Sequence, residues 1–380
     1  MDPTAPLALL GGLSPALFMK RHWQKKPLLV RQAIPGFQPL LPPRELFALA
    51  ARQEVESRLV VHEGRSWRLQ RGPFARRALP PLKQSGWTLL VQGVDLHHAG
   101  AHALLHGFDF VPAARLDDLM ISYATDGGGV GPHFDSYDVF LLQAQGRRRW
   151  RIGRNSDLQL QQGVPLKILA SFEPEQEFVL EPGDLLYLPP RYAHDGIAEG
   201  ECQTYSIGFR APAQAELARE LLQRIGDEAA EEGTQRLYQD AAQPATEAPG
   251  AIPAGLRAFA QQALAAALKD AAALDRALGE YLTEPKANVW FEPGRAPRRL
   301  RALVLDARTR MLHDARHVFV NGEAWRAAGA DAKLMRRLAD RRRLDPADLA
   351  RASDGARALL ASWCEAGWAH ATDDAGGERQ

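Results

Sequence analysis

The chain has 380 residues, more than one compact core usually holds, and it carries 47 Lys and Arg against 46 Asp and Glu. This near balance argues against a protein that coats polyanions and against an acidic solvating protein, so any basic function must be local. The two cysteines, Cys202 and Cys364, lie far apart. They argue against a disulfide framework or a thiolate zinc site and suit a reducing compartment.

Targeting and membrane signals are also missing from the sequence. The first residues show no basic stretch that leads into a short apolar one, and no run of about 18 apolar residues occurs anywhere. We therefore expect a soluble, cytoplasmic protein with no membrane partner.

The first 50 residues predict short helices between turns. "SPALFMKRHWQKKPLLV" opens with Ser14-Pro15, and "PPRELFALAARQEVESRLV" opens with prolines, both of which are helix start signals. We expect these helices to cover another part of the domain.

The pattern changes between Ser57 and about Ala211. Short apolar runs such as "SRLVVH", "LMISYA", "DVFLLQ", "DLLYLP" and "TYSIGFR" are bounded by Gly, Pro, Asp and Asn, which is typical of many short strands. Only "LHHAGAHALLHG" (96–107) has helical spacing. Gln145-Gly146, which precedes the run "RRWRIG", predicts a hairpin turn.

Helical patterns return after Pro212. "AQAELARELLQRIGDEAAEEG" and "LRAFAQQALAAALKDAAALDRALGEYL", separated by a Pro/Ala linker at 243–255, carry amphipathic stripes. About 70 residues cannot easily bury such stripes alone, so we expect them to dock on another domain or on a second subunit. The last 100 residues predict a small α+β module, in which "RALVLDA" and "HVFVNGEAW" form two strands around a turn beside three helices.

Three polar residues predict a metal site. His133 and Asp135 lie two positions apart, and if this segment is a strand both side chains point to one face, about 6 to 7 Å apart along the chain. His194 follows the predicted strand 185–188 and supplies a third ligand. Two histidines and one carboxylate are typical of non-haem Fe(II) oxygenases, although manganese or zinc in a cupin without redox chemistry remains an alternative.

Arg148 predicts an anion site. In "GRRRWRIG", Arg147, Arg149 and Arg151 alternate with Arg148, Trp150 and Ile152, so Arg148 is the guanidinium on the apolar face. A buried, unpaired charge costs several kcal/mol, and a small dicarboxylate beside the metal would neutralise it by a bidentate pair. An internal ion pair is the alternative.

A slot for a cationic side chain is the third prediction. Asp118 and Met120 share one strand face with Ser122, and Tyr137 continues the face of His133 and Asp135. Tyr137 and Met120 would cover an apolar stem, and Asp118 would meet its charge.

Three further patterns are weaker. "DGGGVG" (126–131) lacks the Lys-Ser/Thr of a phosphate loop and is more typical of a loop at the mouth of a site. His98, His102 and His106 have helical spacing but no paired acidic residue, which favours a solvated or capping face over a metal site. The stretch 295–310 holds six Arg against one Asp, for which a solvated surface is the commoner outcome and contact with RNA the alternative.

Two long stretches carry a family resemblance. "DDLMISYATDGGGVGPHFDSYDVFLLQAQGRRRWRIG" and "EPGDLLYLPPRYAHDGIAEGECQTYSIGFRAP", together with "RHWQKKPLL" and "ESRLV", resemble the bacterial ribosomal oxygenases, which are cupin-fold JmjC-type Fe(II)/2-oxoglutarate hydroxylases. The resemblance covers essentially the whole chain. It is strongest to members that hydroxylate the β-carbon of an arginine in large-subunit ribosomal protein sixteen.

The resemblance implies an α+β protein with three parts. Residues 1–211 would form a double-stranded β-helix (cupin/JmjC) catalytic domain with a helical cover, 212–282 a helical segment that makes a homodimer, and 283–380 a winged-helix-like domain. Specific DNA is not an expected partner.

The resemblance also assigns the site. His133, Asp135 and His194 would bind Fe(II), Arg148 would hold the distal carboxylate of 2-oxoglutarate, and O2 would be the oxidant. Asp118, Met120 and Tyr137 would form the arginine slot. At the pocket-edge positions of Ala124 and Thr204 the family would carry other polar residues, so the resemblance assigns only Arg148 to 2-oxoglutarate. The rival functions are a metal-binding cupin sensor without redox chemistry and a histidine hydroxylase of another ribosomal protein.

Overall fold

The computed structural model describes residues 2–64, 66–232, 236–326 and 328–372. The chain divides into two compact units, Met1–Ala211 and Pro212–Gln380. The first unit holds the predicted β-rich region, and the second holds the helical patterns that follow it.

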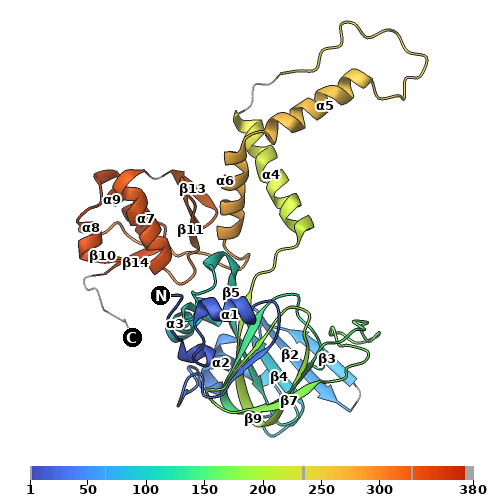
Figure 1. Ribbon diagram of the computed structural model, residues 1–380, viewed down its shortest axis with the longest axis vertical. Helices are drawn as coiled ribbons and strands as arrows, with labels where there is room; N and C mark the ends of the chain where they lie inside the picture. The colour runs from blue at the N-terminus through green and yellow to red at the C-terminus, as the bar shows by residue number, and fades with distance from the viewer. Residues whose placement is uncertain (1, 65, 233–235, 327, 373–380) are drawn as a thin grey trace. The chain divides into compact units, whose positions relative to one another are not determined.

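Short helices open the first unit, as the sequence predicts (Figure 1). Helix α1 (Pro15–Arg21) begins at Ser14, whose Oγ accepts a hydrogen bond from the Leu17 amide, and α2 (Pro43–Leu49) begins on prolines. The third helix, α3, spans Ala99–His106. Four 3₁₀ turns accompany them: η1 (Ala8–Leu10), η2 (Arg76–Ala78), η3 (Val94–Leu96) and η4 (Ala113–Arg115).

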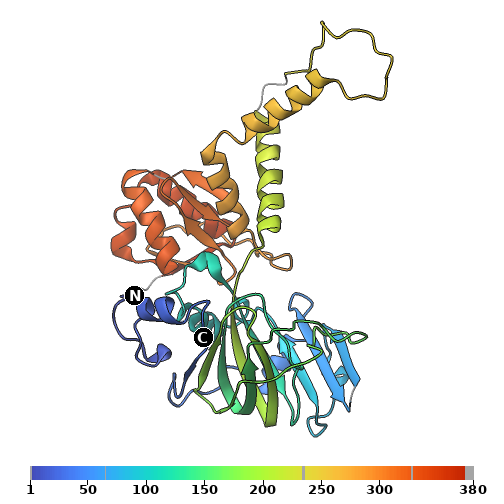
Figure 2. The same cartoon turned by 45° about the vertical axis from the view of Figure 1, so that its right-hand side comes forward.

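The rest of this unit is one nine-stranded antiparallel sheet that curls strongly (Figures 1 and 2). The strand order is β1-β8-β6-β9-β5-β4-β2-β3, and β7 pairs with β6. The strands are β1 (Leu28–Val30), β2 (Ser57–Glu63), β3 (Ser66–Arg71), β4 (Trp87–Val91), β5 (Leu116–Ala124), β6 (Val139–Gly153), β7 (Gln176–Leu180), β8 (Leu185–Leu188) and β9 (Ala193–Phe209). The predicted β-rich domain is confirmed, while β1 and β3 were not predicted.

The predicted hairpin at Gln145-Gly146 is wrong. β6 continues through both residues, and its register with β9 shifts between Gln143 and Gln145 and again between Gln145 and Arg147. Gly146 has φ +63°, and a Cβ there would clash with the Glu201 carbonyl oxygen. A glycine therefore creates a bulge inside one long strand, and the sequence signal of such a bulge resembles that of a turn.

The two faces of the sheet have different environments. The helical cover packs on one face, where Phe18 of α1 lies with its ring centroid 5.0 Å from that of Tyr187 and 5.5 Å from that of Phe140. Leu119 and Ile121 of β5 belong to the same core. Their neighbours Asp118, Met120 and Ser122 therefore point to the opposite face, which is the interior of the curled sheet.

The second unit begins with three helices, α4 (Gln214–Glu232), α5 (Ala254–Ala267) and α6 (Ala271–Thr283). α4 and α6 lie side by side, and the Arg276 and Glu228 side chains form an ion pair between them (Figure 2). The sequence predicts one helix across α5 and α6, which is wrong. The helix is interrupted before Asp270, whose side chain caps α6 by accepting a hydrogen bond from the Ala272 amide.

The remainder of this unit has two small sheets and three helices. β10 (Ala302–Leu305) lies between β14 (Arg343–Leu344) and β15 (Ala369–Thr372), and β12 (His317–Val320) lies between β11 (Met311–His313) and β13 (Glu323–Arg326). The helices are α7 (Gly329–Arg341), α8 (Pro346–Leu349) and α9 (Asp354–Glu365). The expected pairing of "RALVLDA" with "HVFVNGEAW" is wrong, because the second motif forms its own hairpin, β12–β13.

No helix among the described residues is both long and apolar enough to cross a bilayer.

Candidate functional site

His133, Asp135 and His194 come together where β9 begins, beside the segment that leads into β6. One possible ligand atom from each lies within 4.8 Å of those of the other two, and this is the one such group among the described residues. His194 Nε2 lies 3.7 Å from Asp135 Oδ2, and the two imidazole centroids are 4.2 Å apart. The donor set, two imidazoles and one carboxylate, fits a divalent transition metal with open coordination positions.

The backbone fixes both histidines. The amide of His133 donates to the His194 carbonyl over 2.9 Å, and the amide of His194 donates to the His133 carbonyl over 2.8 Å. In addition, the amide of Arg191 donates to the Asp135 carbonyl over 2.7 Å. The three candidate ligands are therefore held by main-chain hydrogen bonds rather than by side-chain packing alone.

Each imidazole also has a defined orientation. His133 Nδ1 lies 2.8 Å from the Gly131 carbonyl oxygen, and His194 Nδ1 lies 3.0 Å from the Tyr192 carbonyl oxygen. A carbonyl can only accept, so each Nδ1 carries the hydrogen, and each Nε2 keeps a free lone pair. This arrangement is typical of histidines that bind a metal.

The electrostatic environment keeps His194 neutral. The residue is 3% exposed, and burial together with the neighbouring His133 lowers its pKa to about 4, against the opposing effect of Asp135. A neutral imidazole does not have to lose a proton before it binds a cation.

Residues 133–137 do not form the strand on which the argument from the two-residue spacing was conditional. His133 makes an isolated β-bridge with His194, and β6 starts only at Val139. The bridge nevertheless gives what the two-residue spacing predicted, because it places His133 and Asp135 beside His194.

Arg148 points inward, as its position in the alternating pattern predicts. The residue is 3% exposed, and its Nη1 donates to Ser122 Oγ over 2.8 Å and to Thr204 Oγ1 over 3.3 Å. Its Nε is buried without a hydrogen-bond partner. Among the described residues no carboxylate pairs with this guanidinium, so the alternative of an internal ion pair is not realised there. A buried cation with free donors fits a bound carboxylate.

The outward arginines behave differently. Arg147, Arg149 and Arg151 are more than a third exposed and pair with Glu199, with Glu177 and Glu199, and with Asp195. The contrast with Arg148 follows from the alternation of a strand.

Trp150 connects Arg148 to the histidines, and we did not predict it as a site residue. The guanidinium carbon of Arg148 lies 5.4 Å from the Trp150 ring centroid, and that ring lies 5.9 Å from His194. Trp150 shares the inward face of Arg148, so the same alternation could have identified it. Its ring packs on Gly196, where a Cβ would lie 2.7 Å from two ring carbons.

Thr204 takes part in the Arg148 site. Besides accepting from Arg148, its Oγ1 donates to Gln143 Oε1 over 2.9 Å. Ala124 lies instead in a small buried cluster with Ala198 and Cys202. At the two positions where the sequence differs from the family, Thr204 therefore supplies a polar group and Ala124 supplies apolar surface. Both cysteines, Cys202 and Cys364, are buried and free.

The predicted slot residues are close together in part. The environment of the Tyr137 hydroxyl raises its pKa, first through desolvation and then through the charges of Asp135 and Asp118, so the phenol stays neutral. Asp118 is buried and accepts a hydrogen bond from the Gly93 amide over 3.0 Å. Met120 is half-buried on the same strand face as Asp118. The Tyr137 hydroxyl therefore lies close to both Asp135 and Asp118.

A buried network next to Tyr137 was not predicted. Asp138 is fully buried and accepts hydrogen bonds from Tyr187 Oη over 2.7 Å, Gln24 Nε2 over 3.0 Å and Arg115 Nη2 over 3.3 Å. These partners are more than 20 residues away in sequence, so no local pattern reveals them. The network fixes the chain between the candidate ligands and β6.

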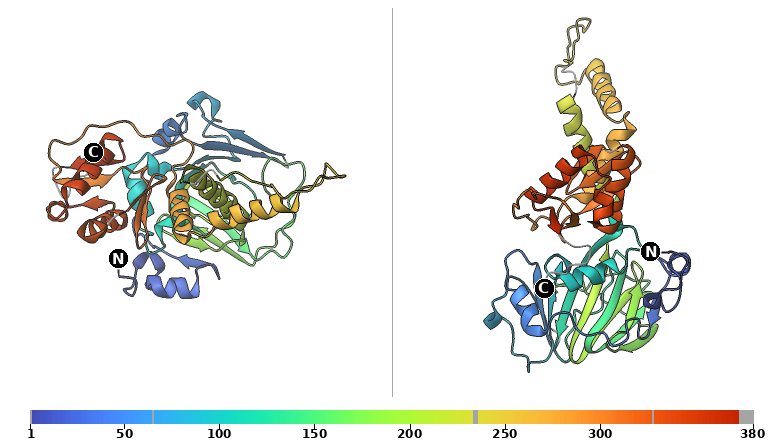
Figure 3. Two further views of the ribbon diagram at one scale, coloured as in Figure 1. Left: turned by 90° about the horizontal axis from the view of Figure 1, so that it is seen from above. Right: turned by 90° about the vertical axis from the view of Figure 1, so that its left-hand side faces the viewer.

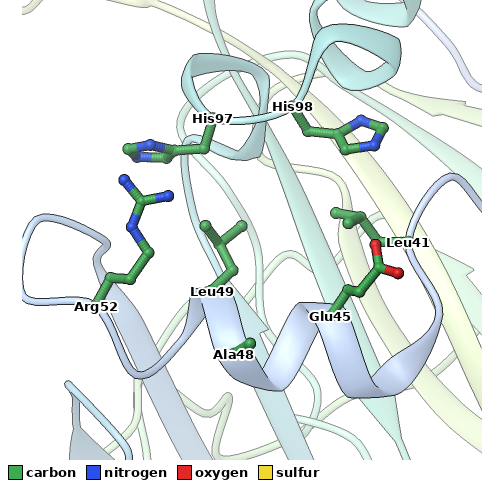
Figure 4. Close-up of a pocket in the computed structure, with 7 residues that line it drawn as sticks. All are labelled: Leu41, Glu45, Ala48, Leu49, Arg52, His97 and His98. Atoms are coloured by element: carbon green, nitrogen blue, oxygen red, sulfur yellow. The ribbon is translucent and has the colours of Figure 1, made fainter. Parts of the chain in front are cut away.

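The helix-borne histidines have a structural role instead. His98 caps α3 by accepting the Ala101 amide at Nδ1, and His106 contacts Asp109. His97 and His98 also line a shallow cavity of about 240 Å³, together with Leu41, Glu45, Ala48, Leu49 and Arg52 (Figure 4). Arg52 points toward His97 in this cavity, yet it already pairs with Glu54. None of the predicted site residues lies there.

The glycine loop is held in place by hydrogen bonds. The Gly127 amide donates to the Ala198 carbonyl, and the Ala198 amide donates to the Gly128 carbonyl, each over 2.9 Å. No helix begins at this loop, which excludes the phosphate-loop interpretation.

Comparison with known proteins identifies the family. The JmjC domain family matches residues 103–217, and the ROXA-like winged helix matches 266–370. The Escherichia coli ribosomal protein uL16 3-hydroxylase is 44% identical over 203 residues, which are 53% of each chain. The crystal structure of E. coli ycfD is 31% identical with a TM-score of 0.80 over 93% of this chain and 96% of that one.

A related crystal structure shows YcfD, a ribosomal oxygenase, in complex with cobalt and 2-oxoglutarate, with a TM-score of 0.78. This chain belongs to the JmjC-type ribosomal oxygenases. In the sequence alignments it spans about half the length of the curated relatives it matches. The predicted fold class, a double-stranded β-helix with helices and a winged-helix domain, is confirmed.

The contact between Gly196 and Trp150 gives a test of the site geometry in this oxygenase. We expect Gly196→Ala to displace the Trp150 ring, because the new methyl group would lie 2.7 Å from it. Overpacking of this kind costs about 1–3 kcal/mol, and it would appear as a lower unfolding temperature and a changed near-ultraviolet circular dichroism spectrum.

Gly226→Ala is the matched control. Gly226 is exposed in α4, and beyond its chain neighbours and the helix's own backbone no atom lies within 4 Å of the place that the new methyl group would take. This change should therefore stabilise the helix by up to about 1 kcal/mol. Equal behaviour of the two variants would contradict the packing of Trp150 on Gly196.

Proposed function

We propose that this chain is an Fe(II)- and 2-oxoglutarate-dependent hydroxylase that adds a hydroxyl group to the β-carbon of an arginine in large-subunit ribosomal protein sixteen. The observation that carries the proposal is Arg148, a buried guanidinium that faces the same interior as the His133–Asp135–His194 group. The similarity to the uL16 3-hydroxylase and to the 2-oxoglutarate complex of YcfD supports it.

His133, Asp135 and His194 would hold the iron through the two Nε2 atoms and a carboxylate oxygen. When bound, Fe(II) supplies the oxidative chemistry that couples the decarboxylation of 2-oxoglutarate by O2 to hydroxylation of a substrate carbon. The protein's own task is then positioning. The carbonyls of Gly131 and Tyr192 orient the imidazoles, and the backbone bridge between residues 133 and 194 fixes their separation.

Arg148 would bind the distal carboxylate of the co-substrate. Ser122 and Thr204 accept from one terminal nitrogen and so hold the guanidinium plane in place. The Trp150 ring lies near both the guanidinium and His194, so it would limit the access of water to the space between them. A site without water strengthens the attraction between the Arg148 guanidinium and the distal carboxylate of 2-oxoglutarate.

The choice of an arginine substrate rests on the slot. With Asp135 committed to the metal, Asp118 is the carboxylate that gives the surroundings of Tyr137 negative charge, which favours a cationic guest over a neutral one. A histidine hydroxylase would share the metal and co-substrate sites and differ only here. A metal-binding sensor would have no use for Arg148.

We further propose that the enzyme is a homodimer that works in the cytoplasm, where ribosomes assemble. Support for the dimer comes from α4, α5 and α6, which expose Leu222, Leu256, Leu264, Leu268 and Leu274 by 39–60%. No residue of α5 is buried. Large apolar side chains exposed on neighbouring helices are typical of an interface between subunits.

The first experiment is mass spectrometry of recombinant ribosomal protein sixteen after incubation with the enzyme, Fe(II), O2 and 2-oxoglutarate. We expect one arginine to gain one oxygen, and this gain should require 2-oxoglutarate.

Arg148→Gln should lower kcat/KM for 2-oxoglutarate on the order of 100-fold, because a charge-assisted bidentate pair is lost. The neighbouring Arg147→Gln, on the exposed face, should leave it unchanged.

The rival functions give different results in this assay. A metal-binding sensor would bind a divalent cation but would consume no 2-oxoglutarate. A histidine hydroxylase would add the oxygen to a histidine-containing ribosomal protein and leave the arginine substrate unmodified.

Asp118→Asn tests the slot. The amide can still accept the hydrogen bond from the Gly93 amide but carries no charge. We therefore expect KM for the arginine substrate to rise about tenfold, the effect of losing about 1.4 kcal/mol of ion pairing, while KM for 2-oxoglutarate is unchanged. Asp117→Asn, at the partly exposed carboxylate in the β-bulge that pairs with Arg210, is the control. An unchanged KM for the arginine substrate in Asp118→Asn would contradict the slot.

Light scattering tests the dimer. We expect the wild type to have about twice the chain mass of 41.9 kDa and the Leu264→Glu/Leu268→Glu variant to have the mass of one chain, because two charges would enter an apolar interface. Leu82→Glu, at a similarly exposed leucine of the first unit, should stay dimeric. A wild-type monomer at micromolar concentration would remove the dimer from the proposal.

A further inference from the structure

The segment between α6 and the winged-helix sheet has a surface that the hydroxylase reaction does not use. Between Trp290 and Arg301 it forms neither helix nor strand (Figure 3). It carries four arginines and one acidic residue, Glu292. The arginines, Arg295, Arg298, Arg299 and Arg301, are all exposed.

These arginines differ from the ion-paired arginines of the chain. Arg149, Arg224, Arg276, Arg308 and Arg337 each pair with a carboxylate. The four in this segment form no ion pair with any described residue. An outside partner can therefore use their charges without breaking an ion pair within the described part of the chain.

The backbone of the segment is anchored at both ends. Phe291 packs on Trp368 and lies under the guanidinium of Arg308, and the Gly294 amide donates to the Glu365 carbonyl over 2.8 Å. At the other end the chain enters β10, which pairs with both neighbouring strands. Between the anchors Pro297 and Leu300 are half-buried, so the arginines around them project to solvent.

An exposed aromatic ring stands at the start of this row. Trp290 is 56% exposed, and its backbone is fixed because its carbonyl accepts a hydrogen bond from Arg308 Nη1 over 3.2 Å. Four spaced guanidinium groups can follow a phosphate backbone, and an exposed indole is a stacking platform for an unpaired base.

We propose that the surface formed by Trp290, Arg295, Arg298, Arg299 and Arg301 binds single-stranded RNA. An irregular segment cannot enter a major groove as a recognition helix does, which favours a single strand over a duplex. A membrane surface would use the charges but would not require one aromatic ring fixed beside them. The choice of RNA over DNA rests on the proposed function, since RNA is the polyanion that surrounds ribosomal proteins.

The test is fluorescence anisotropy of a labelled single-stranded RNA with the full chain over a salt series, without 2-oxoglutarate or protein substrate. If the four arginines contact four phosphates, the slope of log affinity against log salt is about −2.8, which is about 50-fold between 50 and 200 mM salt. The variant with Arg295, Arg298, Arg299 and Arg301 all changed to Gln should lose this slope. Trp290→Ala should weaken binding of the single strand on the order of tenfold.

The matched control changes four exposed arginines elsewhere, Arg44, Arg68, Arg77 and Arg326, to Gln, and it should bind as the wild type does. An equal loss in this control would show attraction by net charge alone and would overturn the proposal. Equal or tighter binding of duplex RNA, of single-stranded DNA of the same sequence, or of vesicles containing phosphatidylserine would also overturn it. Because the assay contains neither co-substrate nor ribosomal protein, its failure is distinguishable from failure of the hydroxylase.

Discussion

The pair of main-chain hydrogen bonds between His133 and His194 is the constraint on which the site depends. One bridge joins two segments that are 61 positions apart and leaves the imidazole centroids 4.2 Å apart. The same bridge brings the Asp135 carboxylate close to His194, since only one residue separates Asp135 from His133. In a free loop, binding a metal would have to order three ligands and would lose their conformational entropy. Here much of that entropy is already lost when the sheet forms.

The long strands β6 and β9 extend this constraint to the second half of the site. Their register pairs Ile152 with His194 and Arg148 with Ala198, so Arg148 lies four residues along the strand from the histidine. Trp150 lies between them on the same inward face. The bulge at Gly146 separates this part of β6 from the part that packs on the helical cover, which allows one strand to serve both.

The sequence predicted the residues whose role follows from local alternation. Arg148 was assigned to the buried face from five neighbouring residues, and that assignment holds because strand alternation is a property of the backbone. Gly146 was misinterpreted because a glycine with positive φ occurs both in turns and in bulges, and only the partner strand distinguishes them. Asp138 could not be found at all, since Gln24, Arg115 and Tyr187 approach it from distant parts of the chain.

Burial of an unpaired charge is a cost that the fold accepts at Arg148. The chain satisfies one terminal nitrogen with two hydroxyl groups and leaves Nε without a partner. Such a site lowers the stability of the protein by an amount that a bound carboxylate would recover, so ligand binding and folding stability are linked. The same reasoning separates Arg148 from the exposed arginines at 295–301, which remain hydrated and add affinity for a polyanion without any cost to the fold. Two kinds of unpaired arginine therefore indicate two kinds of anion: a small one that must enter a dry interior, and a long one that stays at the surface.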